Sequence, residues 1–493
     1  MTASIDARKL AVQQAFEETL AIVNGPTDRA IHDVERSLWS ALLGLGRALI
    51  ALYLARAAAR PRPATYGHAG AKYEVAGWQT TEIGTRFGKV EFTRPVGRRI
   101  GWQRAACDRL VDRDLGLCSG FSLTTVMSVT RLCAQLAFAN ARATFASFCE
   151  WAPSQRTVLR MVDAVGAEAR GFMESAPAPD DDGDVLVIQV DGRGAPMVDG
   201  AELERRRRPH HKHRGPKRLA RRRRRRLRER PRRAKGDKSK NAKVAFVGVV
   251  YTLRTTPDGC EGPLNKRLCA TFKSHAALFE WLVLEATKRG YGRKPTVFLA
   301  DGAEAIWTLQ ARYFPDADPC IDWFHIVEKL WAAGRCLHRE GSSALAAWVG
   351  QRVRELRRPS GADAAVTAMS HAYAQIAKTG PGNKAKRAKL LEVIEHLGKH
   401  KHRMRYHALR QQDLDIATGS GEGAVRNLVG MRLDGPGMRW SLDRAEHVLH
   451  LRCILINGQW DDFAASLGTG PGVLRLAATP TPTRSHDAVK VAA

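Results

Sequence analysis

The chain has 493 residues, 44% of them apolar, and a formal net charge of +29. That much apolar sequence supports two or three domains with packed cores, which excludes a wholly disordered chain. The nine cysteines, at positions 107, 118, 133, 149, 260, 269, 320, 336 and 453, form no CxxC pair. We therefore predict no zinc site and no disulfide framework, and we expect reduced thiols in a cytoplasmic protein.

Most of the positive charge lies in one Arg-rich segment, residues 205–243. It holds 22 Lys and Arg against Glu229 and Asp237, a net +20 of the chain's +29, and includes the run Arg221, Arg222, Arg223, Arg224, Arg225 and Arg226. Like charges at this density cannot pack, so we expect the segment to be disordered alone. A phosphate backbone is its natural partner, bound tightly at low salt and without sequence preference. The alternative is a solvated insert with no partner.

Residues 1–174 are expected to form a mostly helical region with a small sheet. Two helices are predicted over Ala7–Val23 and Asp33–Ala59, on either side of a Gly-Pro break. Between residues 73 and 100 the apolar period changes from helical to alternating, which predicts a hairpin sheet.

One apolar stretch, Trp39–Ala55, is long enough to raise the question of a membrane span. Arg47 lies in its middle, and the N-terminus lacks the basic-then-apolar layout of a signal peptide. We therefore expect a buried bundle helix in a soluble protein with no membrane partner, and a membrane span is the alternative.

A helix-turn-helix is predicted at residues 143–165. Its second helix would begin after Ser154, a favourable N-cap, and would expose Gln155, Arg156 and Arg160. These three side chains are the candidates for DNA contact. Any two helices joined by a tight turn share this pattern, so a purely structural hairpin is the alternative.

Residues 184–339 and 413–465 are expected to form one α/β domain. A Pro- and Asp-rich linker, residues 175–183, precedes it, and residues 340–412, which are helical and charged, interrupt it as a helical insertion. The predicted element order from residue 184 is β, β, β, α, β, α, β, α, which indicates a sheet of mixed direction. The tail, residues 466–493, is expected to be disordered.

Three acidic residues stand at the ends of elements in this domain. Asp191 and Asp301 each end an apolar strand, and Glu422 lies in a Gly-rich turn that runs into a helix. Carboxylate oxygens are the ligands that Mg²⁺ prefers, and two such ions about 3.5–4 Å apart can cleave a phosphodiester. Asp191, Asp301 and Glu422 are therefore the candidate catalytic residues and ligands of two Mg²⁺ ions, for which Mn²⁺ can substitute. An Asp-Gly turn after a strand is also common, and that alternative stays open for each aspartate taken alone.

Further residues near these acids are candidates for orienting them or for contacting phosphate: Asp322, His325, Arg426, Arg439 and Trp440. Arginine suits phosphate through its paired donors, and an exposed tryptophan can stack on an unpaired base. The alternatives are a structural carboxylate for Asp322, a core histidine for His325 and a core aromatic for Trp440.

Several segments together resemble bacterial insertion-sequence transposases of the ISKra4 family, within the Mutator-like DDE group. The matching stretches are Val190–Gly192, Leu299–Ala303, Ile321–His325, Ile416–Arg426, Gly437–Ser441 and Asn457–Trp460. The resemblance implies an RNase H-like catalytic core with a helical insertion, with Asp191, Asp301 and Glu422 as its triad and Asp322 and His325 as a D-x-x-H element. It also implies cutting and joining of double-stranded DNA at terminal inverted repeats and in target DNA, by a homodimer or higher multimer.

The chain departs from relatives that carry a CxxC zinc ribbon, because only Cys107 and Cys118 lie in that region. The implied location is the bacterial cytoplasm, at the nucleoid. Two other classes remain open: a catalytically inactive, transposase-derived DNA-binding protein, which would have no need of three acids, and an RNA-binding factor, which would explain the Arg-rich segment alone.

Overall fold

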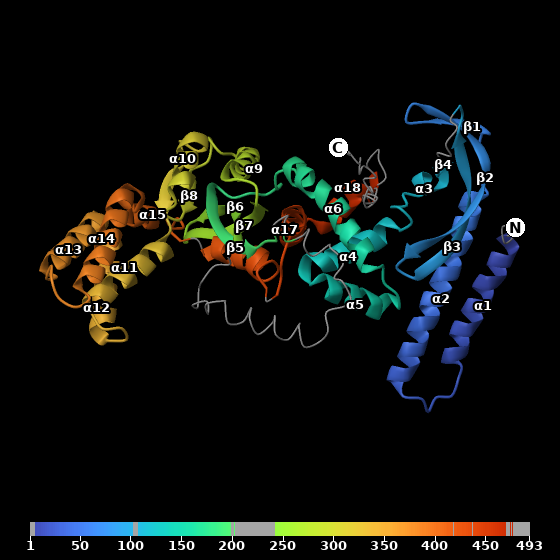
Figure 1. Ribbon diagram of the computed structural model, residues 1–493, viewed down its shortest axis with the longest axis horizontal. Coiled ribbons are helices and arrows are strands. Elements are labelled where there is room, and N and C mark those ends of the chain that lie inside the picture. The colour runs from blue at the N-terminus through green and yellow to red at the C-terminus, as the bar shows by residue number, and fades with distance from the viewer. Residues whose placement is uncertain are drawn as a thin grey trace, which may run out of the picture. The chain divides into compact units, whose positions relative to one another are not determined.

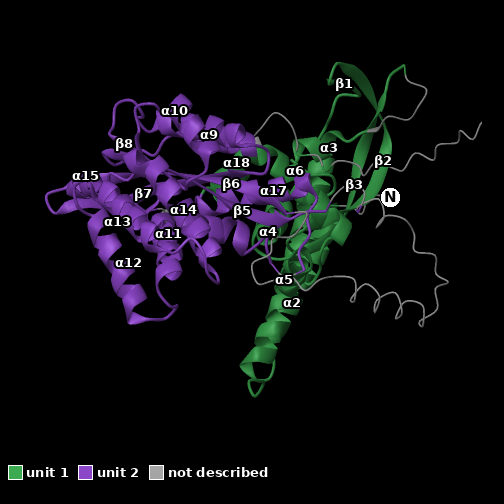
Figure 2. Cartoon of the chain, turned by 60° about the vertical axis from the view of Figure 1, so that its left-hand side comes forward, with its two compact units in different colours: residues 1–169, 459–493 green, residues 170–458 purple. Residues whose placement is uncertain are grey.

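The computed structural model describes residues 5–101, 107–198, 202, 242–417, 419–435, 437–469, 474 and 476. The chain divides into two compact units, residues 1–169 with 459–493 and residues 170–458 (Figure 2). The Arg-rich run Arg221–Arg226, and all of residues 205–241, lie outside the described residues, as does nearly all of the tail after residue 469. The expectations of disorder and DNA contact for these segments therefore stay predictions.

Unit 1 begins with two helices and a small antiparallel sheet, as predicted. The helices are α1 (Ile5–Val23) and α2 (Ile31–Ala58). The strands, in spatial order, are β1 (Thr65–His68), β2 (Ala71–Thr85), β3 (Gly88–Arg99) and β4 (Cys107–Asp108). One face of α2 packs on the sheet, where Leu54 and Ala58 join Ile83, Phe92 and Val111 in a buried cluster.

The opposite face of α2 is largely uncovered. Trp39, Leu49 and Tyr53 are about half exposed, so the expectation of a buried bundle helix holds for one face only. By length and composition α2 could cross a membrane, and it is the only helix in the described part of the chain that meets this test.

The rest of unit 1 is helical and contains the predicted helix-turn-helix. Its helices are α3 (Leu110–Asp114), α4 (Leu123–Gln135), α5 (Phe138–Cys149), the first part of α6 (Gln155–Ser175) and α18 (Trp460–Thr469). Glu150 ends α5 in a left-handed conformation, and the Ser154 hydroxyl accepts the Thr157 amide at 3.2 Å to cap α6. Gln155 and Arg156 are exposed, whereas Arg160 donates to the Leu476 carbonyl at 2.7 Å. Both helices are therefore confirmed, and DNA contact stays a prediction.

The chain end groups differently from the expectation that residues up to 465 belong to the sheet domain. Helix α18 falls in unit 1. Arg131 of α4 forms an ion pair with Asp461 at 3.8 Å, and Phe463 is fully buried. The amphipathic α18 thus buries its apolar face within the helical unit.

Unit 2 is built on a five-stranded mixed sheet, which confirms the predicted α/β class and element order. Its strands are β5 (Val185–Pro196), β6 (Ala242–Thr256), β7 (Gly259–Thr271), β8 (Thr296–Ala300) and β9 (Asp318–Ile321). Their spatial order is β7-β6-β5-β8-β9. The pairs β5–β6 and β6–β7 are antiparallel, and β5–β8 and β8–β9 are parallel.

Helices cover the sheet and fill the predicted insertion (Figure 1). Helices α9 (His275–Lys288) and α10 (Glu304–Tyr313) connect strands, and α11 (Trp323–Leu337) follows the last strand. Those in the insertion are α12 (Ser343–Leu356), α13 (Gly361–Gln375), α14 (Asn383–His400), the 3₁₀ turn Lys401–Arg403 and α15 (Tyr406–Gln411). The chain then returns to the sheet through α16 (Gly419–Val425), the π-helix Arg426–Gly430 and α17 (Leu442–Ile456).

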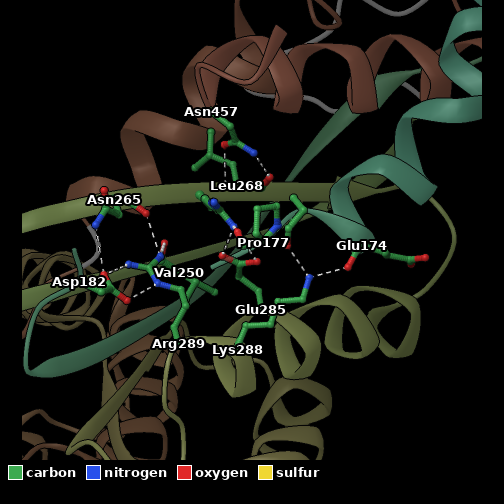
Figure 3. Close-up of polar contacts among 12 residues, drawn as sticks. Glu174, Pro177, Asp182, Val250, Asn265, Leu268, Glu285, Lys288, Arg289 and Asn457 are labelled. Atoms are coloured by element: carbon green, nitrogen blue, oxygen red, sulfur yellow. Dashed lines mark hydrogen bonds and ion pairs between the residues drawn. The ribbon is translucent and has the colours of Figure 1, made fainter. Parts of the chain in front are cut away.

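The predicted linker, residues 175–183, is tied firmly to the sheet domain. Asp182 receives two hydrogen bonds from the buried guanidinium of Arg289, at 2.6 and 2.9 Å, and Arg289 also donates to the Val250 and Asn265 carbonyls. Lys288 donates to the Ala176 carbonyl at 2.8 Å and to the carbonyl of Glu174, just before the linker, at 2.5 Å (Figure 3). Composition alone suggested a loose segment, but its carboxylate and carbonyls satisfy basic side chains of α9.

The buried Asp182–Arg289 pair predicts how the stability of the protein depends on pH and on Asp182. Burial by itself would raise the pKa of Asp182, but the Arg289 and Thr252 hydrogen bonds outweigh it and hold the pKa at about 2. The stabilisation is therefore present at neutral pH and is lost only as the pH falls toward 2. Asp182→Ala would leave a buried charge unpaired, so we expect the free energy of unfolding to fall by about 3 kcal/mol.

Chemical denaturation followed by circular dichroism measures this loss, and Asp181→Ala is the matched control. Asp181 also pairs with an arginine, Arg254, but both side chains are largely exposed, so little change is expected. Equal losses in the two variants would contradict the buried-pair argument.

Candidate functional site

Strand register places three aspartates side by side across three neighbouring strands of the sheet. Val190 of β5 pairs with Ala300 of β8, and Ala300 pairs with Ile321 of β9. The next residue on each strand is Asp191, Asp301 and Asp322. Neighbouring strands lie about 4.8 Å apart, so the three carboxylates follow one row across three parallel strands.

The strands hold this register because they are apolar and covered on both faces. Residues 185–190 of β5 and all of β8 are buried. On one face Leu278 and Leu282 of α9 lie against Gly248, which pairs with Val190. The three aspartates come one residue after the paired residues Val190, Ala300 and Ile321, so they point to the opposite face of the sheet. A slip of one residue would bury them under α9.

Backbone amides fix each aspartate locally. Asp191 accepts from the Gly192 amide at 2.6 Å, and Asp301 accepts from the Ala303 amide at 3.0 Å. Asp322 is 4% exposed and caps α11, where it accepts from the His325 amide at 2.8 Å. Asp322 therefore has a structural role as well as a place in the row.

Glu422 reaches the same face of the sheet from α16. The chain before α16 is anchored to β5 and β6, because Gln189 donates to the Tyr251 hydroxyl at 2.9 Å and that hydroxyl donates to Asp415 at 2.5 Å. Gln189 lies two residues before Asp191, so its side chain is on the same face.

The far end of α16 is fixed by a buried arginine. The π-helix Arg426–Gly430 follows α16 directly. The guanidinium of Arg452, from α17, donates to the Leu428 carbonyl at 3.0 Å and to the Asn427 carbonyl. Wide π turns are frequent at functional sites, and here the turn orients the helix that carries Glu422.

These elements enclose a pocket of about 110 Å³. It is lined by Val190, Asp191, Asp301, Asp322, His325, Glu328 and Glu422. The structure thus brings together all three candidate catalytic acids with Asp322 and His325. Glu328 was missed, although it lies one turn after His325 on α11, a spacing that places both on one helix face.

Charge repulsion is built into this pocket. Burial raises the pKa of Asp191 to about 6, and the nearby carboxylates of Asp301, Glu422 and Asp322 add to the rise, against the Gly192 hydrogen bond. Burial also raises the pKa of Glu422, helped by Asp322 and Glu328. A cluster of carboxylates that resist ionisation together favours a bound cation.

The donor chemistry fits Mg²⁺, which takes hard oxygen ligands. Within the described ranges, no three His, Cys, Asp or Glu side chains already form a group that could hold an ion. Coordination would therefore require the carboxylates around the pocket to rotate toward a common point.

The remaining candidates divide into exposed and buried residues. Arg426 and Arg439 are exposed, so both are open to a phosphate. Trp440 is 4% exposed, its indole N–H donates to the Leu433 carbonyl at 2.9 Å, and the Arg432 guanidinium lies 4.8 Å from its ring. Trp440 is therefore a core aromatic, and the expectation that it contacts phosphate or stacks on a base is corrected.

The backbone around Trp440 has a separate role, because it extends the sheet beside the pocket. Trp440 donates to the Pro196 carbonyl at 3.2 Å, and its own carbonyl accepts from Val198 at 2.8 Å. The segment thereby covers the end of β5, a few residues beyond Asp191.

The chain matches no protein-family model, and no curated protein matches it. The residues and geometry of this pocket are therefore the main guide to its function.

The raised pKa of Asp191 predicts a stability gain on neutralisation. An unfolded aspartate titrates near pH 3.9, whereas Asp191 in the folded protein titrates at about 6. Ionisation therefore opposes folding, and the metal-free protein loses stability as the pH rises from about 4 to above 6. Asp191→Asn should stabilise the metal-free protein at neutral pH by about 2 kcal/mol, and the gain should vanish near pH 4.

Thermal unfolding in EDTA at both pH values measures this effect. Asp316→Asn is the control, because Asp316 is an exposed acid on the loop before β9 and does not line the pocket. A gain of equal size at both pH values would show that the gain does not come from removing the charge of the Asp191 carboxylate.

Proposed function

We propose that the protein is a DDE-type transposase, which cleaves DNA at the ends of an insertion sequence and joins those ends to target DNA with two Mg²⁺ ions. The observation that carries the proposal is the convergence of Asp191, Asp301 and Glu422 on one pocket. These acids are more than a hundred residues apart in sequence, and no structural requirement of the sheet explains why all three should meet.

The architecture supports the same proposal. The first strand of the domain, β5, is central, β6 and β7 follow as antiparallel strands, and β8 and β9 are parallel to β5. Helices α12 to α15 stand between the second and third acids. This arrangement agrees with the RNase H-like core and helical insertion that the ISKra4-family resemblance implies.

Each residue of the pocket has a distinct part in the proposed reaction. Asp191, from the central strand, would hold the ions together with Asp301 and Glu422, through their carboxylate oxygens. Two Mg²⁺ ions, when bound, would activate the attacking oxygen and stabilise the leaving oxygen. Asp322 orients the first turn of α11, so that His325 faces the pocket and can donate to a phosphate oxygen.

DNA would be attracted by the positive charge of the Arg-rich segment. The Arg-rich segment lies between β5 and β6 in the sequence. Pro196 of β5 and Ala242 of β6, the ends of these strands, pair with each other five residues beyond Asp191. Gln155 and Arg156 of the helix-turn-helix are exposed and provide a second candidate contact to DNA.

The reaction itself tests the triad. On a duplex carrying the element's inverted-repeat end, Mg²⁺-dependent strand transfer should fall by at least about a hundredfold in Asp191→Asn, Asp301→Asn and Glu422→Gln. Binding to the same duplex, measured by mobility shift, should persist because phosphate contacts dominate affinity.

Asp316→Asn is again the matched control and should keep full strand transfer. Wild-type activity in all three pocket variants would end the proposal. A wild-type protein that binds the repeat end but never cuts it with Mg²⁺ or Mn²⁺ would instead favour the inactive, DNA-binding alternative.

A further inference from the structure

The helical insertion touches the turn that carries Asp301 through one side chain, His396 of α14. A methyl group at Gly302 would lie 2.2 Å from Cε1 and 2.9 Å from Nε2 of the His396 ring. Gly302 does not have a positive φ, so its backbone would accept an ordinary side chain. The imidazole of His396 therefore occupies the space that a side chain at position 302 would need, and a substitution there would have to move the ring or the turn.

A set of contacts on one side of α14 holds His396 in this place. Lys399 pairs with Glu304 at 2.6 Å. His400 is 1% exposed, packs near the Trp307 ring with 6.3 Å between centroids, and lies 2.9 Å from the Arg403 guanidinium, which covers Trp307 at 4.5 Å. Residues 396, 399, 400 and 403 are spaced to share one helical face, and that face rests on α10, directly after the Asp301 turn.

The same ring also faces the second aspartate-bearing segment. The centroids of His396 and His325 are 5.4 Å apart, and the His325 amide is the one that binds Asp322. His396 thus lies between the turn of Asp301 and the first turn of α11. Its Nε2 is buried with no hydrogen-bond partner in the described part of the chain, a costly arrangement that calls for a physical explanation.

We propose that His396 is a positioning residue, through which the helical segment 343–411 fixes the Asp301 turn and so sets the metal affinity of the pocket. The inference rests on the proposed role of Asp301 as a metal ligand. Partners that orient a ligand from outside typically change metal affinity by 10- to 100-fold when removed. The insertion would then be a part of the active site and not only an added domain.

A double-mutant cycle with Mn²⁺ alone tests this coupling in the full-length protein. The loss of the free-ion electron paramagnetic resonance signal gives the dissociation constant without any DNA or turnover. Gly302→Ala should weaken Mn²⁺ binding by about tenfold or more, because the new methyl displaces the turn. In a His396→Ala background, the same substitution should cost less than about threefold, because the ring that it strikes is gone.

Gly398→Ala is the matched control on α14, since a methyl group at Gly398 meets no atom within 4 Å and Mn²⁺ binding should not change. Equal losses from Gly302→Ala in both backgrounds, or none in either, would overturn the inference. If Gly302→Ala alone does not fold, a folded, Mn²⁺-binding double variant supports the coupling, and a double variant that also fails to fold overturns it.

Asp301→Asn separates this inference from the function on which it rests. If Asp301→Asn binds Mn²⁺ as tightly as the wild type, the metal assignment itself is wrong. If Asp301→Asn loses binding while the Gly302 and His396 substitutions act independently, the metal assignment stands and only the positioning role of His396 fails.

Discussion

The parallel pairing of β5, β8 and β9 is the constraint on which the whole pocket depends. Because Val190, Ala300 and Ile321 form one row, the residues that follow them form the next row on the opposite face. Register in such a sheet is set by apolar side chains covered on both faces, and a shift by one position would reverse every side chain of the strand. The buried aliphatic and aromatic residues of unit 2 therefore determine where the carboxylates meet, although none of them takes part in the chemistry.

This convergence has an energetic cost that the surrounding structure must offset. Five carboxylates, those of Asp191, Asp301, Asp322, Glu328 and Glu422, line a pocket of about 110 Å³. Burial raises the pKa of Asp191, and the neighbouring carboxylates add to the rise. At Arg289, by contrast, the buried positive charge is paired with Asp182 and donates to backbone carbonyls. The same domain thus neutralises its structural charges and leaves those of the pocket uncompensated, a pattern typical of sites that await a cation.

Local sequence patterns predicted the features that depend on residues close together in the chain. The apolar runs before Asp191 and Asp301 indicated the strands, Ser154 indicated a helix start, and the element order indicated a mixed sheet. The errors concern contacts between distant segments. Trp440 carried no local sign that its indole would be buried beside Arg432, and the composition of residues 175–183 gave no sign of Arg289. His396 follows Gly302 by 94 positions, and only the packing of α14 on α10 brings them together.

The acidic pocket and the Arg-rich segment, residues 205–243, carry opposite charges. In the proposed reaction, a pocket lined by carboxylates would attract Mg²⁺ but repel DNA phosphates, so substrate and metal would have opposite electrostatic preferences at one place. The acidic residue of β5 and the basic residues that follow this strand are separated along the chain. Asp191 lies within β5. The residues that carry the 20 excess positive charges, 205–243, come only after this strand has ended at Pro196. Under the proposed function, the phosphate-binding residues would be separated in sequence from Asp191, which would leave the carboxylates available to Mg²⁺.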